Sequence, residues 1–205
     1  GDVYKRQVIS IGNYLPSQGC IEENAKLLAR YAKIVQKNNM VPIVEPEVLM
    51  DGSHSIEECY DATSRTLKSL FQNLEEENVD ITGTILKPNM VTPGSECQEK
   101  IGVETVAKET LRCLHECVPV NLPAITFLSG GQSETVSTEH LDAMNKIGGF
   151  PWKLSFSYGR ALQAGALKAW LGKSENIDAA QSAFSHRALM NKKAALGQWS
   201  KDLEV

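Results

Sequence analysis

The segment Gly83-Thr-Ile-Leu-Lys-Pro-Asn-Met-Val-Thr-Pro-Gly94 ends a short apolar run on Lys87, and a proline follows at once. A strand that ends in this way places an amine at the mouth of a barrel, in a partly dry site. Desolvation disfavours the ammonium form of a lysine, and a neutral amine can attack a ketone to form a Schiff base. Lys87 is therefore the first candidate for covalent chemistry, although a lysine at a strand end is more often a solvated surface charge.

Apolar runs and helical patterns alternate on both sides of this segment. Short strands are expected over residues 8–11, 41–49, 84–87, 123–128 and 152–158. Helices are expected over about 17–38, 55–74, 103–117 and 137–145, and again from residue 160 to the end with a break near 172–173. Strands separated by helices predict parallel strands joined by right-handed crossovers.

Two parallel folds fit this order: an open doubly wound sheet and a closed (β/α)8 TIM barrel. No G-x-G-x-x-G follows the first strand, which disfavours a dinucleotide-binding sheet. The unusual polar residues lie at strand ends, where barrels keep their functional groups. A complete barrel needs about 250 residues, more than the 205 present. The sequence thus predicts an α/β fold, a partial (β/α)8 TIM barrel with roughly strands 5–8 and the end of strand 4.

The domain organisation follows from this count. Residues 8–205 are expected to form the C-terminal half of a single barrel domain, including its terminal helices. Residues 1–7 fit no pattern and are expected to be a non-native junction.

Composition excludes several classes of partner. The net charge of −4 is not that of a nucleic-acid-binding surface, and no apolar run approaches the roughly 20 residues that cross a membrane. The histidines show no metal-binding spacing, and the odd, scattered cysteines indicate reduced thiols in the cytoplasm. We expect no metal, nucleic acid or membrane as a partner.

Two glutamates on the preceding strand indicate acid–base chemistry near Lys87. Glu45 and Glu47 are two residues apart, so they are expected to share one face of a strand. If that face and the lysine look into one barrel, an acid can protonate the departing hydroxyl while a base collects protons as the imine forms. The alternative is a structural Glu–Lys ion pair at the barrel rim.

Two later strand ends suit a phosphate. Ser129-Gly130-Gly131 combines a hydroxyl with glycines that let backbone N–H groups approach an anion. Gly159-Arg160 adds a guanidinium fork, and a helix is expected to begin after each segment. Ser-Gly-Gly alone is usually a plain turn, but the two segments together match the loops after strands seven and eight, the usual phosphate cradle of this barrel.

Taken together, these segments resemble class I fructose-bisphosphate aldolases, the Schiff-base type. The resemblance implies that Lys87 forms the imine without a metal or other cofactor, that Glu45 is its acid/base, and that Glu47 neighbours the lysine. It also implies that Ser129, Gly130, Gly131, Gly159 and Arg160 hold a substrate phosphate, with Ser157 near the same site. The motifs that carry it are 41–47 (VPIVEPE), 86–94 (LKPNMVTPG), 126–133 (TFLSGGQS) and 156–164 (FSYGRALQA).

The resemblance implies a glycolytic and gluconeogenic lyase that reversibly cleaves fructose 1,6-bisphosphate to glycerone phosphate and glyceraldehyde 3-phosphate. Intact members are tetrameric homo-oligomers with known cytoskeletal partners. The family's acidic residue on strand one and lysine on strand three would lie upstream, so we expect the chain alone to be inactive and to self-associate. The alternatives are another Schiff-base phosphosugar enzyme, such as a transaldolase, and a non-catalytic scaffold.

Overall fold

The computed structural model describes residues 7–204, so the junction predicted for residues 1–7 lies outside the described residues except for its last position. The helices are α1 (Gln18–Lys37), α2 (Ile56–Glu76), α3 (Val103–Cys117), α4 (Glu134–Ile147), α5 (Arg160–Trp170) and α6 (Ile177–Ala194). The strands are β1 (Gln7–Ile9), β2 (Ile43–Val44), β3 (Pro46–Val48), β4 (Ile85–Leu86), β5 (Ala124–Phe127) and β6 (Lys153–Phe156). Short 3-10 turns are η1 (Ile81–Gly83), η2 (Ser174–Asn176) and η3 (Lys201–Glu204).

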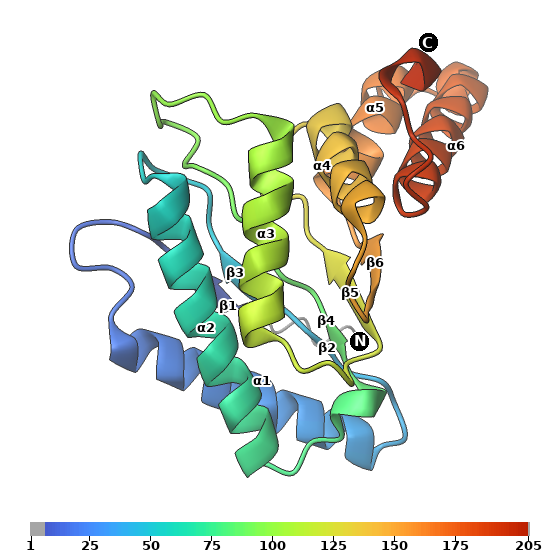
Figure 1. The fold of residues 1–205 in the computed structure, drawn as a ribbon. Coiled ribbons are helices and arrows are strands. Elements are labelled where there is room, and N and C mark those ends of the chain that lie inside the picture. The colour runs from blue at the N-terminus through green and yellow to red at the C-terminus, as the bar shows by residue number, and fades with distance from the viewer. Residues whose placement is uncertain (1–6, 205) are drawn as a thin grey trace.

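The strands form a two-stranded sheet, β1-β3, and a four-stranded sheet in the order β2-β4-β5-β6. β1 pairs with β3, β2 with β4, β4 with β5 and β5 with β6, and every pair is parallel. Helices α2 and α3 stand side by side in front of the strands, with α1 and α4 packed against them in turn (Figure 1). A doubly wound sheet would reverse its strand order and carry helices on both faces. The fold is therefore an arc of a (β/α)8 barrel, as predicted.

The single strand predicted over 41–49 is wrong in detail, because it is two short strands separated by Glu45. β2 pairs only with β4, whereas β3 pairs only with β1. Pro46 has no N–H to donate to a ladder, and the staggered strands of a barrel offset the ladders on their two sides. Glu45 therefore lies where the chain changes from one neighbour to the other.

The two faces of the sheet are covered differently. One row of side chains across β2, β4, β5 and β6 is fully buried, which is the face under the helices: Val44, Leu86, Ile125 and Leu154. The residue before each of these points to the opposite face. That row is less protected, and Ile43 in it is 43% exposed. Within residues 7–204 the concave face is therefore the open one.

Serine side chains cap the starts of α1, α2 and α4. The Ser55 hydroxyl accepts from the Glu58 amide while the Glu58 carboxylate accepts from the Ser55 amide, which is the predicted capping box. Ser133 accepts from the Val136 amide at 3.2 Å, so α4 begins at Glu134, not at the predicted residue 137. In the described part of the chain, no helix has the length and apolar character needed to span a membrane.

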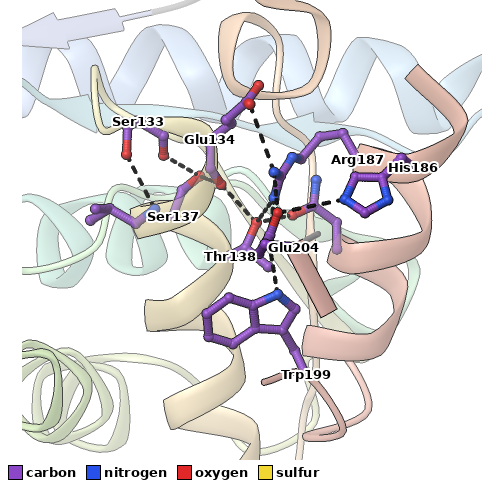
Figure 2. Close-up of polar contacts among 10 residues, drawn as sticks. Ser133, Glu134, Ser137, Thr138, His186, Arg187, Trp199 and Glu204 are labelled. Atoms are coloured by element: carbon purple, nitrogen blue, oxygen red, sulfur yellow. Dashed lines mark hydrogen bonds and ion pairs between the residues drawn. The ribbon is translucent and has the colours of Figure 1, made fainter. Parts of the chain in front are cut away.

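A partly buried ion pair holds the last described residues against the helices. Arg187 of α6 donates to both carboxylate oxygens of Glu204, at 2.9 and 2.6 Å. The same guanidinium donates to Thr138 Oγ1 of α4 at 3.2 Å, and Trp199 Nε1 donates to Glu204 at 2.8 Å. Figure 2 shows these side chains converging on Glu204 from α4, α6 and the segment that follows. We call Arg187, Glu204 and Trp199 the C-terminal clamp.

Candidate active site

Lys87 follows β4 directly and lies beside Glu45. Its backbone N–H donates to the Val44 carbonyl at 2.8 Å, which continues the ladder between β2 and β4. Its side-chain nitrogen is 3.0 Å from Glu45 Oε1. Lys87 is only 6% exposed and Glu45 only 8%. The lysine nitrogen is thus held inside the protein against a carboxylate, where charge interactions are stronger than in water.

Glu47 is also buried, two residues beyond Glu45, and it is 4% exposed. It lies in β3, where it is in register with Val8 of β1. The two glutamates are therefore both buried at the point where the chain changes its sheet partner. The structure places Glu45 Oε1 3.0 Å from the Lys87 nitrogen, and the roles of both glutamates stay predictions.

Asn89 is a further residue at this strand end that the sequence analysis did not single out. Its Oδ1 accepts from the Val48 amide at 3.1 Å, and its Nδ2 donates to Thr63 Oγ1 of α2 at 3.0 Å. The side chain therefore joins the segment after Lys87 to β3 and to the helix layer. Only one feature of the sequence pointed to Asn89, which is its position directly after Pro88. Because proline has no N–H, the backbone at that point cannot donate to the neighbouring strand.

The loops that follow β3 and β4 are joined to each other along the rim. Gly94 lies at the centre of this junction, and a Cβ atom on it would come within 2.2 Å of the Gly52 carbonyl oxygen. Only glycine allows so close an approach. Three backbone hydrogen bonds of 2.7 to 2.9 Å make the junction: Gly94 to His54, Ser95 to Met50 and Glu96 to Gly52.

The predicted phosphate residues lie at the adjoining strand ends. The Leu128 amide donates to the Pro88 carbonyl at 3.1 Å, so the turn that begins at Ser129 leaves the sheet next to the segment after Lys87. The Ser157 amide donates to the Phe127 carbonyl at 2.9 Å. Ser129 is buried and Ser157 half-buried. In the turn, Gly130 and Gly131 have φ values of +57° and +91°, which glycine adopts readily.

Of the two helices that begin near these turns, α5 is the better anion site. Its N-cap is Gly159, without a side-chain cap, and its first turn has no acidic residue. Gly159 and Arg160 are both exposed. At the start of α4, in contrast, Ser133 already caps the helix and Glu134 puts a carboxylate in the first turn. Free N–H groups and a positive helix end favour an anion at α5.

The arrangement can hold a phosphorylated ketone across neighbouring strand ends. An amine and a carboxylate lie together at the ends of β4 and β2, and the serine, glycine and arginine positions follow at the ends of β5 and β6. Among residues 7–204, no group of three or more His, Cys, Asp or Glu side chains could hold a metal ion. The chemistry that these groups support is nucleophilic attack on a carbonyl with proton transfer by a neighbouring acid.

Comparisons with known proteins agree on one family. The family model for class-I fructose-bisphosphate aldolase matches residues 4–205. The chain is 53% identical over 201 residues to fructose-bisphosphate aldolase 4, cytosolic, of Arabidopsis thaliana, a match that covers 98% of this chain and 51% of the relative. It is also 53% identical over 195 residues to fructose-bisphosphate aldolase B of Ovis aries, covering 95% of this chain and 54% of that protein.

A solved structure supports the same assignment. The fructose-bisphosphate aldolase of Plasmodium falciparum, crystallised with TRAP and a small-molecule inhibitor, superimposes with a TM-score of 0.93 at 46% identity, over 95% of this chain and 57% of that one. The chain thus spans about half the length of the curated relatives it matches. On its fold, its strand-end residues and these matches, the chain belongs to the class-I fructose-bisphosphate aldolase family.

Proposed function

We propose that this chain is part of a cytoplasmic fructose-bisphosphate aldolase and carries the Schiff-base amine of its active site. The observation that carries the proposal is the buried contact of 3.0 Å between the Lys87 nitrogen and Glu45. The whole enzyme reversibly cleaves fructose 1,6-bisphosphate to glycerone phosphate and glyceraldehyde 3-phosphate. It works as a lyase, without a metal, in glycolysis and gluconeogenesis.

Glu45 serves the lysine in two steps. Attack on the ketone requires the neutral amine, so the carboxylate first takes a proton from the Lys87 ammonium. When the nitrogen bonds to the carbonyl carbon, one of its protons passes to the carbonyl oxygen, which becomes a hydroxyl group. The protonated Glu45 then gives its proton to that hydroxyl, which leaves as water. The resulting protonated imine withdraws electrons from the adjacent carbon–carbon bond, which can then break or form. Glu47, two residues on, is the neighbouring acid.

The substrate phosphate is held at the ends of the next two strands after the amine, β5 and β6. Ser129, Gly130 and Gly131 offer a hydroxyl and backbone N–H groups from the end of β5. Gly159 and Arg160 offer the start of α5 and a guanidinium, with Ser157 beside them. This assignment is supported by the position of the two turns. Both follow strands that are parallel to β4, so they lie at the same end of the sheet as Lys87.

The intact enzyme is a homo-oligomer, a tetramer as in the family, that binds phosphosugars and makes contacts with the cytoskeleton. Two of the similar Arabidopsis proteins are named cytosolic, which supports a cytoplasmic location.

Trapping with borohydride tests the proposal on the chain as it stands, because it detects imine formation on Lys87, a step that comes before the turnover expected to be absent in the chain alone. The chain is incubated with glycerone phosphate, reduced, digested and analysed by mass spectrometry. We expect one covalent adduct, on Lys87, and none in a Lys87→Met variant. Lys33 is a matched control, because it forms a 2.9 Å ion pair with Glu77 but is 35% exposed, and it should stay unmodified. An unmodified Lys87 in the folded chain would contradict the proposal.

A further inference from the structure

A buried histidine lies behind the turn that is proposed to bind phosphate. His140 of α4 is 6% exposed, and its Nδ1 is 2.6 Å from Oε1 of Gln132. Gln132 ends the turn that begins at Ser129, because its backbone N–H donates to the Ser129 carbonyl at 3.0 Å. The imidazole therefore contacts the residue that closes the turn, and does so from the helix layer.

Gln132 also reaches toward the amine. Its Nε2 donates to the Met90 sulfur at 3.6 Å, and Met90 lies three residues after Lys87 in the segment that leaves β4. One amide side chain thus has its oxygen on a helix residue and its nitrogen on the segment next to the lysine. The amide oxygen can only accept a hydrogen bond and the amide nitrogen can only donate one. The two contacts therefore fix the orientation of the Gln132 side chain and hold the turn against both neighbours.

The chemistry of the histidine agrees with this bridge. Burial disfavours the imidazolium and lowers the pKa of His140 to about 4, so the ring is neutral near pH 7. A neutral ring that carries its proton on Nδ1 donates to the amide oxygen of Gln132. That choice orients the amide nitrogen toward Met90, so the contacts to His140 and to Met90 are both satisfied.

We propose that His140 is a positioning residue, which acts through Gln132 to set the distance between the phosphate-binding turn at Ser129 and the amine of Lys87. This inference rests on the proposed function and goes beyond it, because it assigns the spacing between the two halves of the site to a side chain that touches neither the ketone nor the phosphate. Binding of a phosphorylated ketone depends on the distance between the turn at Ser129 and the amine of Lys87. A ketone without a phosphate depends only on the amine.

This difference supplies the test. Adduct formation on Lys87 is measured by borohydride trapping over a range of concentrations, once with glycerone phosphate and once with glycerone, which lacks the phosphate. In His140→Leu, which removes the donor, we expect the half-saturating concentration of glycerone phosphate to rise about tenfold. The value for glycerone should not change. His140→Asn should restore most of the loss, because its Nδ2 can occupy the position of the imidazole Nδ1.

Two controls separate positioning from a general loss of structure. His115→Leu removes a histidine that contacts Trp152 and lies on α3, so neither ketone should be affected. Hydrogen exchange should accelerate in His140→Leu at the amides of residues 128–132 but not in α3. A Gln132→Leu/His140→Leu double variant should be no worse than Gln132→Leu alone, since both act through one contact.

Each outcome decides a separate question. If neither ketone forms an adduct with the unmodified chain, the proposed function fails, and this inference fails with it. If both ketones form adducts but His140→Leu leaves the glycerone phosphate value unchanged, or raises both values equally, the inference alone is overturned. Failure of His140→Asn to restore the value would also overturn it, because the donated hydrogen bond would then not be the cause.

Discussion

The Lys87 nitrogen and Glu45 Oε1 lie 3.0 Å apart, and both side chains are almost wholly removed from solvent. The two residues are joined across adjacent strands, since the Lys87 amide donates to the carbonyl of Val44, the residue before Glu45. The ladder between β2 and β4 therefore helps to set the position of the pair. This placement is the one that the proposed proton transfer between Glu45 and Lys87 requires.

Glu45→Gln should slow imine formation without removing the amine. The amide cannot take the lysine proton or return it to the hydroxyl, so the rate of borohydride-trapped adduct on Lys87 should fall by about 100-fold. The measurement is the time course of trapping at saturating glycerone phosphate. A Glu45→Gln variant that traps as fast as the unmodified chain would show that the contact is only structural.

Arg187→Met should release the C-terminal clamp. Arg187 and Glu204 are 7% and 15% exposed at their side chains, and removing one partner leaves a carboxylate with lost hydrogen bonds. We expect a loss of about 2–3 kcal/mol in the free energy of unfolding, measured with urea. Lys108→Met breaks an exposed pair of 3.6 Å with Glu104 and should change stability very little. Equal effects of the two substitutions would contradict this account.

The same clamp should weaken in acid. Burial raises the pKa of Glu204, but hydrogen bonds from Arg187 and Trp199 outweigh it and hold the pKa below its ordinary value of 4.5. The stabilisation is therefore complete above pH 4.5 and is lost as the pH falls through the lower folded value. Hydrogen exchange of residues 195–204 should rise in that range, and Arg187→Met should remove this pH dependence.

His140 should make stability depend on pH in a higher window. Its pKa is about 4 in the folded chain and 6.5 in the reference state, so the unfolded chain binds the proton first as the pH falls. The free energy of unfolding should then decrease between pH 6.5 and 4, by roughly 2–3 kcal/mol in total. Urea titrations at several pH values measure this slope. His140→Asn should flatten it, and an unchanged slope in that variant would assign the effect to another group.

Gly94→Ala should disrupt the junction between the loops after β3 and β4. A Cβ atom would collide with the Gly52 carbonyl oxygen at 2.2 Å, and backbone atoms cannot move aside as a flexible side chain would. We expect a loss of about 1–3 kcal/mol in the free energy of unfolding. Gly19→Ala in α1 meets nothing within 4 Å and should have a neutral or slightly stabilising effect. Thermal unfolding of both variants would distinguish close packing from a general intolerance of substitution.

The chain by itself should associate. Within residues 7–204, β1 and β6 each pair on one side only, and the open face carries Ile43 at 43% exposure. Unpaired strand edges next to apolar surface favour contacts between copies. Light scattering after size exclusion should show a mass that grows with concentration, and Ile43→Lys should reduce it. A concentration-independent monomer with ordinary aldolase turnover would refute the expectation that the chain alone is inactive and self-associates.

Sequence alone determined the succession of elements and the residues at the strand ends. Serine caps, apolar periodicity and turn residues are local properties, so they placed α1, α2 and α3 to within about two residues of their observed limits. The order of strands and helices then placed Lys87, Ser129 and Arg160 at one end of a parallel sheet, because every strand of such a sheet runs the same way.

Tertiary structure decided which of these side chains touch. The division of the 41–49 segment at Glu45, the bridge from Asn89 to Val48 and the contact of His140 with Gln132 all depend on the stagger of strands and on how α2 and α4 pack on them. Arg187 and Glu204 likewise meet because the segment after α6 folds back against that helix, which no periodic pattern in the sequence predicts. A hydrogen bond requires its donor and acceptor atoms to lie about 3 Å apart. Packing of the whole core sets interatomic distances that closely, whereas local sequence patterns do not.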